Sequence, residues 1–528
     1  MTHNLYNLLL KPGAPSDARV ALRTDTGRTD TGRTDTGQTD TGRTWTYADL
    51  WRTAGRMAHV LHEAGVGPGN RVAVQVAKSP EAVCLYLAVL QLGAVYLPLN
   101  TAYTLAELRY FLDDAEPTVF VGQTPVVGDL VPPAGCRTFT LDPNGEGTVT
   151  AACRGRPPWE RVADVGPDEV AAILYTSGTT GRPKGAMISH GNLAFGTRTL
   201  DALWGISEAD VLLHALPIFH AHGLFIALNS MLYAGASSVF LPKFTADAAI
   251  EHLPHSTVFM GVPTLYTRLL ADPRLTRERC GSMRLFTCGS APLSREIFEA
   301  FEARTGHRIL ERYGMTETTI IASNPLDGER LPGTVGYPLP GLEVRVVDAA
   351  GQPQPAGTVG GLELRGPNVF KGYWRMPEKT AAEFRPDGFF MTGDLARAAP
   401  DGRLTLVSRA KEIIISGGYN VYPREVEIVL NRIDGVSETA VFGVPHPDFG
   451  EGVVAAVERQ PGCESLDPAS ILARAAHELA GYKLPKAVIV QDALPRNAMG
   501  KILKNELSSL HKDVFRKKDV FRKRDATG

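Results

Sequence analysis

The sequence has few cysteines, almost no net charge and no long uninterrupted hydrophobic segment. Its 528 residues include six scattered cysteines with no CxxC pair, so neither a disulfide framework nor a cysteine-bound zinc site is indicated. A formal net charge of -2 argues against nucleic acid as a partner, because proteins that bind it carry a basic excess. Since no secretory leader is apparent, we expect a cytoplasmic protein.

The most hydrophobic segment covers residues 82–99, AVCLYLAVLQLGAVYLPL. It contains no charged residue and approaches the length that spans a membrane, but Gln91, Gly93 and Pro98 divide it. The pattern therefore predicts a short buried helix followed by a strand, and no membrane span.

Strand-like and helix-like segments alternate along the first two thirds of the chain. RVAVQVA precedes the residue 82 helix, AVYLPL follows it, and a capping box of Thr104 and Glu107 opens LAELRYFLDDA before the strand TVFVG. This βαβ order predicts an α/β fold with mostly parallel sheets and helices on their faces. A chain of this length is expected to form two or more domains.

The pattern changes after about residue 335, where short strands and turns predict a small antiparallel subdomain. A smaller, mobile α+β domain is expected to follow. We place the boundary between residues 408 and 409, which gives a large domain, 1–408, and a small C-terminal domain, 409–528.

Two tandem repeats stand apart from this organisation. Residues 24–43 read TDTGR, TDTGR, TDTGQ, TDTGR, a polar insert that we interpret as an expanded surface turn. The unit KDVFRK occurs twice from residue 512 to 523 and begins a basic tail that ends at residue 528. The tail could touch an anionic surface, but two phenylalanines are a weak anchor, so a solvated tail is favoured.

The segment YTSGTTGRPKG, residues 175–185, follows an apolar run that is expected to form a buried strand. Its spacing excludes a Walker loop, which needs Gly-Lys-Ser/Thr after a longer gap. Glycines, hydroxyls and Lys184 together still predict a loop that binds phosphate groups, with an ordinary mobile loop as the alternative.

Other segments contain residues suited to a nucleotide. In ERYGMTE, Tyr313 offers a ring for a purine and Glu317 a carboxylate for Mg²⁺, or the segment is simply a capped helix start with a surface glutamate. Asp394 in MTGDL could accept hydrogen bonds from a ribose or merely close a turn. The three histidines in HALPIFHAH lack a neighbouring Cys or acidic residue, so they are weak evidence for zinc.

Seven motifs occur in one order: YTSGTTGRPKG, LPIFHAHG, CGSAPL, ERYGMTE, FFMTGDL, SRAKEIIISGGYNVYPREVE and PRNAMGK. In these motifs the chain resembles the acyl-adenylate-forming superfamily of acyl-CoA synthetases, luciferases and peptide-synthetase adenylation domains, and within it the malonyl-CoA synthetases. The resemblance extends from about Tyr47 to Leu507. It implies that a carboxylate and ATP give an acyl-AMP and pyrophosphate, and that coenzyme A then displaces AMP.

The resemblance also implies roles for individual residues. Lys501, His220 and Glu317 are the expected catalytic residues, with Lys501 acting on the α-phosphate and His220 gating the acyl pocket. Thr176 and Glu317 are the expected Mg²⁺ ligands, Lys411 is the expected hinge, and His222 is expected to be structural. The residues expected to bind ATP or coenzyme A are Thr176, Ser177, Gly178, Thr179, Thr180, Gly181, Lys184, Ser290, Ala291, Pro292, Tyr313, Gly314, Thr316, Asp394, Arg409, Gly417 and Gly418.

The acid is expected to be malonate or methylmalonate, because most acyl pockets of the superfamily are apolar, whereas two arginines are candidates for this one and the second stands where a glycine or small residue is common. These are Arg268 and Arg312, with His220 and Ser290 completing the pocket, whereas Arg284 is a poorer candidate. An aryl or fatty acyl-CoA synthetase and a luciferase-like oxygenase remain the alternatives. The expected partners are small molecules alone, with no obligate protein partner.

Overall fold

The buried apolar segments of the first 340 residues form strands of two sheets, each with helices packed beside it. The computed structural model describes residues 3–10, 17–24, 42–176, 183–497 and 500–515. The chain separates into one unit of residues 1–343 with 364–390, and a second of residues 344–363 with 391–528. Each unit is described by itself below.

One sheet of the first unit has the strand order β6-β5-β3-β4-β7-β8, and its neighbours run parallel except for the antiparallel pair β7 and β8. The predicted βαβ order is confirmed here. The strands are β3 (Arg71–Gln75), β4 (Val95–Pro98), β5 (Val119–Gly122), β6 (Arg137–Thr140), β7 (Val170–Thr176) and β8 (Lys184–Ser189).

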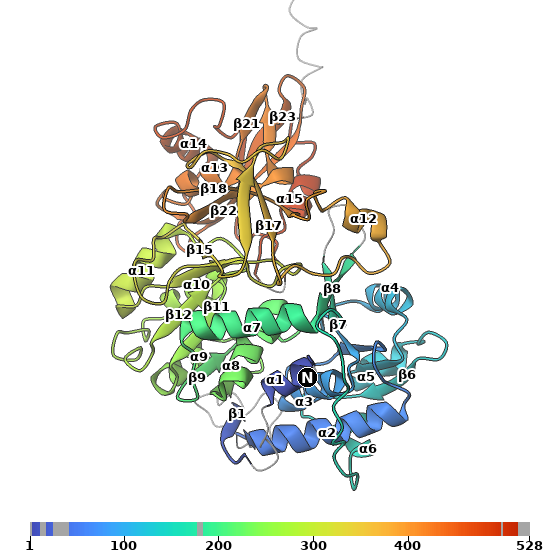
Figure 1. The fold of residues 1–528 in the computed structure, drawn as a ribbon. Helices are drawn as coiled ribbons and strands as arrows, with labels where there is room; N and C mark the ends of the chain where they lie inside the picture. The colour runs from blue at the N-terminus through green and yellow to red at the C-terminus, as the bar shows by residue number, and fades with distance from the viewer. Residues whose placement is uncertain (1–2, 11–16, 25–41, 177–182, 498–499, 516–528) are drawn as a thin grey trace, which may run out of the picture. The chain divides into compact units, whose positions relative to one another are not determined.

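Helices α2 (Tyr47–Glu63) and α3 (Pro80–Gln91) lie side by side in this unit (Figure 1). Every residue of α3 is buried, and Gly93 turns the chain into β4 with a φ of 66°, so the predicted helix and strand within residues 82–99 are confirmed. The capping box of Thr104 and Glu107 is also confirmed, because it opens α4 (Leu105–Ala115).

The other sheet of the first unit has the order β15-β14-β13-β12-β11-β9-β10-β1-β2. The strands from β13 to β1 in this order run parallel, and the pairs at both ends are antiparallel. The strands are β1 (Val20–Thr24), β2 (Thr44–Thr46), β9 (Val211–His214), β10 (Ser237–Phe240), β11 (Val258–Gly261), β12 (Leu285–Cys288), β13 (Leu310–Tyr313), β14 (Ala322–Ser323) and β15 (Tyr337–Pro338).

Most of the remaining helices of the first unit connect these strands, whereas α1 precedes β1 and α12 lies between residues 365 and 390. A π-helical segment, η2 (His222–Leu228), precedes α8 (Asn229–Ala234), and all seven of its residues are buried. The others are α1 (Leu5–Leu9), α5 (Thr124–Asp129), α6 (Thr148–Ala152), α7 (His190–Trp204), α9 (Ala246–His252), η3 (Leu253–His255), α10 (Pro263–Ala271), α11 (Arg295–Thr305) and α12 (Pro377–Ala381).

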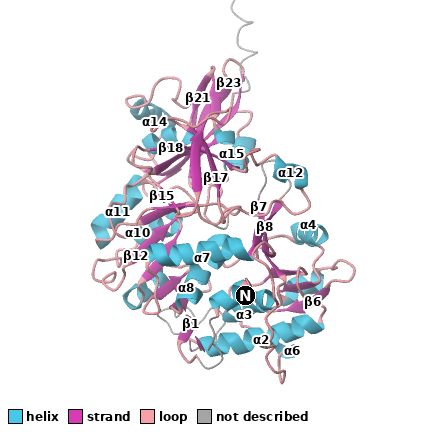
Figure 2. Ribbon diagram, in the orientation of Figure 1, coloured by secondary structure: helices cyan, strands magenta, loops and turns pink. Residues whose placement is uncertain are grey.

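The sheet β16-β17-β18-β19 covers the segment expected to be antiparallel, and β18 and β19 do pair antiparallel. Most of this sheet falls in the second unit. Its strands, drawn as magenta arrows in Figure 2, are β16 (Glu343–Val347), β17 (Gly360–Arg365), β18 (Phe390–Ala398) and β19 (Leu404–Arg409). The predicted domain boundary at residues 408 and 409 stays a prediction.

The C-terminal part of the second unit is an α+β arrangement, as expected. Its sheet has the order β21-β20-β23-β22, and β24 pairs parallel with β23. The elements are η4 (Ala410–Glu412), β20 (Ile414–Ser416), β21 (Tyr419–Val421), α13 (Pro423–Leu430), β22 (Val436–His446), β23 (Gly450–Arg459), α14 (Pro468–Ala475), β24 (Ala487–Gln491) and α15 (Lys504–Leu510).

The two tandem repeats lie mainly outside the described residues. The TDTGR insert joins β1 to β2, and at its base the Thr24 N–H donates to the Arg43 carbonyl at 2.9 Å. In the first KDVFRK unit, Phe515 packs against the His446 ring at a centroid distance of 4.7 Å. A solvated tail was favoured from the sequence, but up to residue 515 the structure differs from that prediction. The Phe515 ring packs against Gly452, which has no side chain to occupy that space.

None of the helices in the described part of the chain is both long and apolar enough to cross a membrane.

Candidate active site

Four parallel strands of the larger sheet end at one edge, where the loops that follow them meet. β9, β11, β12 and β13 are consecutive neighbours in this sheet. In open parallel sheets, ligands bind at the carboxyl ends of the strands, because the loops and helix N-termini gather there. The segment LPIFHAHG follows β9, CGSAPL starts at the last residue of β12, and ERYGMTE starts within β13 and continues past its end.

Arg312 of β13 is the most unusual residue at this edge. The residue is 3% exposed, and its Nε and Nη2 atoms have no hydrogen-bond partner among the described residues. Its guanidinium packs on Gly289, where a side chain would have no room. Desolvation lowers the pKa of Arg312 to about 10, so the group still carries its charge at neutral pH.

Two predicted pocket residues lie beside this arginine. His222 is buried, and its Nδ1 lies 3.2 Å from the Ser290 hydroxyl. Burial lowers the pKa of His222 well below its usual range, and the charge of Arg312 lowers it further. Ser290 itself is exposed and has a φ of 70°, which is unusual for a residue other than glycine and is typical of functional sites.

His220 is half-buried, and burial lowers its pKa to about 4, so the imidazole is neutral at physiological pH. It lies close enough to His222 to contribute to the lowered pKa of that ring. Within the described residues, no cluster of three or more His, Cys, Asp or Glu side chains could hold a metal ion. His220, His222, Ser290 and Arg312 are thus polar residues that gather at these strand ends.

The other two arginines considered from the sequence lie in different surroundings. Arg284 donates to both carboxylate oxygens of Asp210 at 2.7 Å and to the carbonyls of Trp204 and Gly205, so its hydrogen bonds are internal. Arg268 lies in the last turn of α10 and is exposed. Its role as a pocket residue stays a prediction.

A second group of predicted residues surrounds the ends of the hairpin of β7 and β8. The Thr176 hydroxyl donates to the Lys184 carbonyl at 3.4 Å, directly beside the segment 177–182. Ser177, Gly178, Thr179, Thr180 and Gly181 lie outside the described residues. Lys184 Nζ lies 3.7 Å from Glu383 and 4.1 Å from the centre of the Tyr373 ring.

Tyr373 connects this hairpin to the predicted metal ligand. Its hydroxyl donates to Glu317 Oε1 at 2.9 Å, and Glu317 is 6% exposed. A buried carboxylate beside a lysine and a hydroxyl fits a site for Mg²⁺ bound to phosphate groups. Sequence reasoning missed Tyr373, because nothing in the segment KGYW marks it, and its contact with Glu317 spans 56 residues.

The remaining nucleotide candidates of the first unit lie in the loops after β12 and β13. Tyr313 is 7% exposed, and its carbonyl accepts from the Ile321 N–H at 2.8 Å. Gly314 packs against the Thr319 backbone, where a side chain would have no room, so the turn requires glycine. Ala291 and Pro292 follow Ser290, and Thr316 is half-buried near Glu317 in the chain.

The second unit brings three further candidates together. Asp394 and Arg409 are paired across β18 and β19, and Arg409 Nε lies 2.7 Å from Asp394 Oδ1. Lys501 lies in a turn closed by Asn497, whose Oδ1 accepts from the Lys501 N–H at 3.0 Å. Desolvation, and next the charge of Arg409, lower the pKa of Lys501, so the ammonium is close to this pair.

The glycines expected near coenzyme A lie in the turn between β20 and β21. Gly417 and Gly418 have φ values of 58° and 82°, and the Gly417 N–H donates to the Phe449 carbonyl at 2.9 Å. Both positions favour glycine because side chains rarely adopt this conformation. Lys411 lies in η4 and is exposed.

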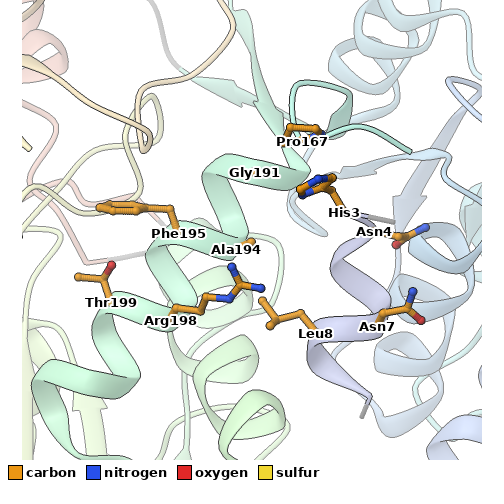
Figure 3. Close-up of a pocket in the computed structure, with 10 residues that line it drawn as sticks. All are labelled: His3, Asn4, Asn7, Leu8, Pro167, Gly191, Ala194, Phe195, Arg198 and Thr199. Atoms are coloured by element: carbon orange, nitrogen blue, oxygen red, sulfur yellow. The ribbon is translucent and has the colours of Figure 1, made fainter. Parts of the chain in front are cut away.

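A hollow of about 430 Å³ lies elsewhere, between α1 and α7 (Figure 3). His3, Asn7 and Arg198 are among its lining residues, and none of the predicted site residues is. The candidate active site is therefore defined by the strand ends and their loops.

Comparisons with known proteins show the family to which the chain belongs. The family model AMP-binding enzyme matches residues 24–374, and the model AMP-binding enzyme C-terminal domain matches residues 425–501. The crystal structure of ATP-bound MatB from Rhodopseudomonas palustris is 48% identical, covers 98% of this chain and 100% of that chain, and has a TM-score of 0.91.

Two curated relatives have different acids in their names. The malonate–CoA ligase of Arabidopsis thaliana is 35% identical, over 83% of this chain and 78% of the relative. The feruloyl-CoA synthase of Amycolatopsis sp is 37% identical, over 88% of this chain and 93% of the relative. The chain belongs to the AMP-binding enzyme family and is one of its acyl-CoA ligases.

Proposed function

We propose that this enzyme ligates malonate, or its methyl-substituted form, to coenzyme A through an acyl-AMP intermediate. One carboxylate of the acid attacks the α-phosphate of ATP and displaces pyrophosphate. The coenzyme A thiol then attacks the acyl carbon and displaces AMP. The second carboxylate of the acid takes no part in either step, so the acyl pocket must accommodate it as a spectator anion.

The observation that supports this acid is the buried guanidinium of Arg312, whose Nε and Nη2 atoms have no protein partner. A buried cation without a partner is costly, and a carboxylate would satisfy it by two parallel hydrogen bonds. His222, His220 and Ser290 add polar groups next to it. A purely apolar acyl group would leave this charge unpaired.

The feruloyl-CoA synthase is as similar to this chain as the malonate–CoA ligase is, so overall identity alone does not select the acid. The likeness to MatB at 48% identity also supports a short dicarboxylic acid. Arg312 favours the dicarboxylate, because an aryl acid has no second anion to pair with a buried guanidinium.

The other groups have roles that their positions support. Lys184, Glu317 and Tyr373 would bind the phosphates with Mg²⁺, whose charge neutralises the developing pyrophosphate. Asp394 and Arg409 would bind the ribose, and Tyr313 would lie against the adenine. Lys501 would stabilise the negative charge that develops as the acid attacks the α-phosphate. The other predicted contacts to ATP and coenzyme A, and the role of Arg268, remain part of this proposal.

A panel of acids tests the proposal directly. With ATP and coenzyme A, we expect malonate to exceed butyrate and benzoate in kcat/KM by up to about 10⁴-fold, because a monocarboxylate leaves the buried cation unpaired. Arg312→Ala should cost about 2–5 kcal/mol for malonate and much less for butyrate. Arg268→Ala should also lower kcat/KM for malonate, but by less than Arg312→Ala does, because the Arg268 side chain is exposed to solvent.

Arg295→Ala is the matched control, because Arg295 is an exposed helix arginine paired with Glu299. It should leave both acids unaffected. A wild-type preference for butyrate or benzoate, or equal losses for malonate and butyrate in Arg312→Ala, would contradict the malonate assignment.

A further inference from the structure

Lys78 is a half-buried lysine that none of the steps above uses. It lies in the turn between β3 and α3, and its ammonium donates to two acceptors of the same residue. These are His214 Nδ1 and the His214 carbonyl, both at 2.7 Å. The Phe240 ring lies 4.3 Å from Nζ, and no carboxylate pairs with Lys78 among the described residues. Desolvation lowers the pKa of Lys78 well below its usual range, because removing an ammonium from water is costly.

One tautomer of His214 satisfies both of its neighbours. When the lone pair of Nδ1 faces the Lys78 side-chain nitrogen, the ring proton of the neutral imidazole is on Nε2. That nitrogen lies 2.9 Å from the Gly223 carbonyl, to which it then donates. The other tautomer would place a nitrogen lone pair against the same carbonyl oxygen, which is repulsive. Lys78 and the Gly223 carbonyl therefore hold the His214 ring from both of its nitrogens.

Gly223 is the second residue of the π-helical segment η2 and is held closely on its other side. The Pro217 carbonyl occupies the space in which a side chain on Gly223 would lie, so the chain packs backbone to backbone here. The first residue of η2 is His222, which contacts Ser290. π-Helical turns recur at functional sites because they displace a side chain from its helical position.

Lys78 thus connects the two sheets of the first unit at the start of the acyl pocket. It follows β3 of one sheet, whereas His214 ends β9 of the other. From these contacts we propose that Lys78 is a positioning residue for acid binding, acting through His214 and the Gly223 carbonyl to place His222 and His220. The proposal rests on the pocket described under the proposed function and adds to it a residue that need not touch the acid.

Lys78→Met tests this, because methionine keeps the length and removes the donor. Pyrophosphate release measured at varied acid and varied ATP separates the two KM values. We expect the KM for the acid to rise about 10- to 100-fold, the scale on which slight misplacement of binding groups acts. The KM for ATP should stay at the wild-type value. Lys78→Arg should restore part of the acid affinity, because it keeps a charged donor.

A double-mutant cycle tests the route of the effect. His214→Gln should raise the KM for the acid as Lys78→Met does, and the double variant should be no worse than either single variant, since both act through one contact. Additive losses in the double variant would overturn the proposal. If Lys78→Met does not fold, His214→Gln and Lys78→Arg still test the proposal. It requires that the KM for the acid changes in these variants while the KM for ATP stays at the wild-type value.

Tyr47→Phe is the control for a merely structural loss. The Tyr47 hydroxyl is a buried donor to the Ala236 carbonyl at 2.7 Å in the same unit. We expect it to lower the melting temperature without changing the KM for the acid. Equal rises in both KM values in Lys78→Met, or the same rise in the acid KM in Tyr47→Phe, would overturn the positioning role. The measurements use whichever acid the wild type accepts best, so rejection of malonate would refute that assignment and leave this test intact.

Discussion

Burial has opposite consequences for the basic residues of the first unit. Arg312 remains charged because even a pKa lowered to about 10 lies above neutral pH. His190, His214 and His222 become neutral, because desolvation lowers their pKa values from a starting point near neutrality. Desolvation therefore leaves the Arg312 guanidinium charged, so that it can pair with an anionic ligand, and makes the three imidazoles neutral hydrogen-bonding groups.

His190 makes this a testable property of stability. It is fully buried as the first residue of α7, its Nδ1 accepts from the Leu5 N–H at 3.1 Å, and burial lowers its pKa to about 4. In the unfolded chain the pKa is about 6.5. Between pH 6.5 and pH 4 the unfolded state binds more protons than the folded state at this residue. The contribution of His190 to the free energy of unfolding is therefore highest above pH 6.5 and decreases as the pH falls toward 4.

We expect protonation of His190 in the unfolded state to lower the free energy of unfolding by about 2 kcal/mol when the pH is lowered from 7 to 5. Denaturant unfolding of the wild type and His190→Gln at both pH values measures it, and the variant should lose less stability on acidification. His255→Gln is the control, because His255 is exposed in the same unit. Equal acid sensitivity of His190→Gln and the wild type would show that another group is responsible.

At the scale of elements, the features that could be predicted are those set by neighbouring residues. The capping box of Thr104, the break at Gly93 and the βαβ order each depend on a few consecutive side chains, and all three occur in the structure. The π-helical segment η2 was not predicted. The Gly223 carbonyl within it contacts His214, and His214 contacts Lys78 across 136 residues of sequence, so periodicity carries no information about these contacts.

The TDTGR insert is a second element whose surroundings allow a prediction. It joins the antiparallel strands β1 and β2, and at its base the Arg43 N–H donates to the Thr24 hydroxyl at 2.8 Å. Because the strands already meet there, replacing residues 25–42 by Asn-Gly should leave turnover and melting temperature nearly unchanged. Loop length alters closure entropy only slowly, by about 0.6 kcal/mol for each doubling.

Arg43 is kept in this variant because it pairs with the buried Glu81. A control with the insert replaced by an equally long Gly-Ser segment separates length from sequence. A large loss of turnover in the Asn-Gly variant but not in the Gly-Ser variant would show that the length of the insert matters to the enzyme.

At the scale of the whole molecule, the candidate residues divide between the two units. The residues proposed to bind the acid, and Lys184, Tyr373 and Glu317, which are proposed to bind the phosphates of ATP, belong to the first unit. Asp394, Arg409 and Lys501 belong to the second. Pairs such as Asp394 and Arg409, which meet across neighbouring strands, could be anticipated from motifs. Tyr373 could not, because its role depends on a contact between segments distant in the sequence.

The last prediction concerns Lys501 and the two half-reactions. If this residue stabilises only the attack on the α-phosphate, Lys501→Ala should slow acyl-AMP formation by roughly 100-fold or more, the scale for removing one preorganised charge. The same variant should convert supplied malonyl-AMP and coenzyme A to the thioester at nearly the wild-type rate, because in that substrate the attack on the α-phosphate is already complete and the thiol attacks the acyl carbon. Lys512→Ala, an exposed lysine of the same unit, should leave both rates unchanged. Rapid-quench measurement of each half-reaction decides between this account and a structural role, since a structural defect would slow both steps together.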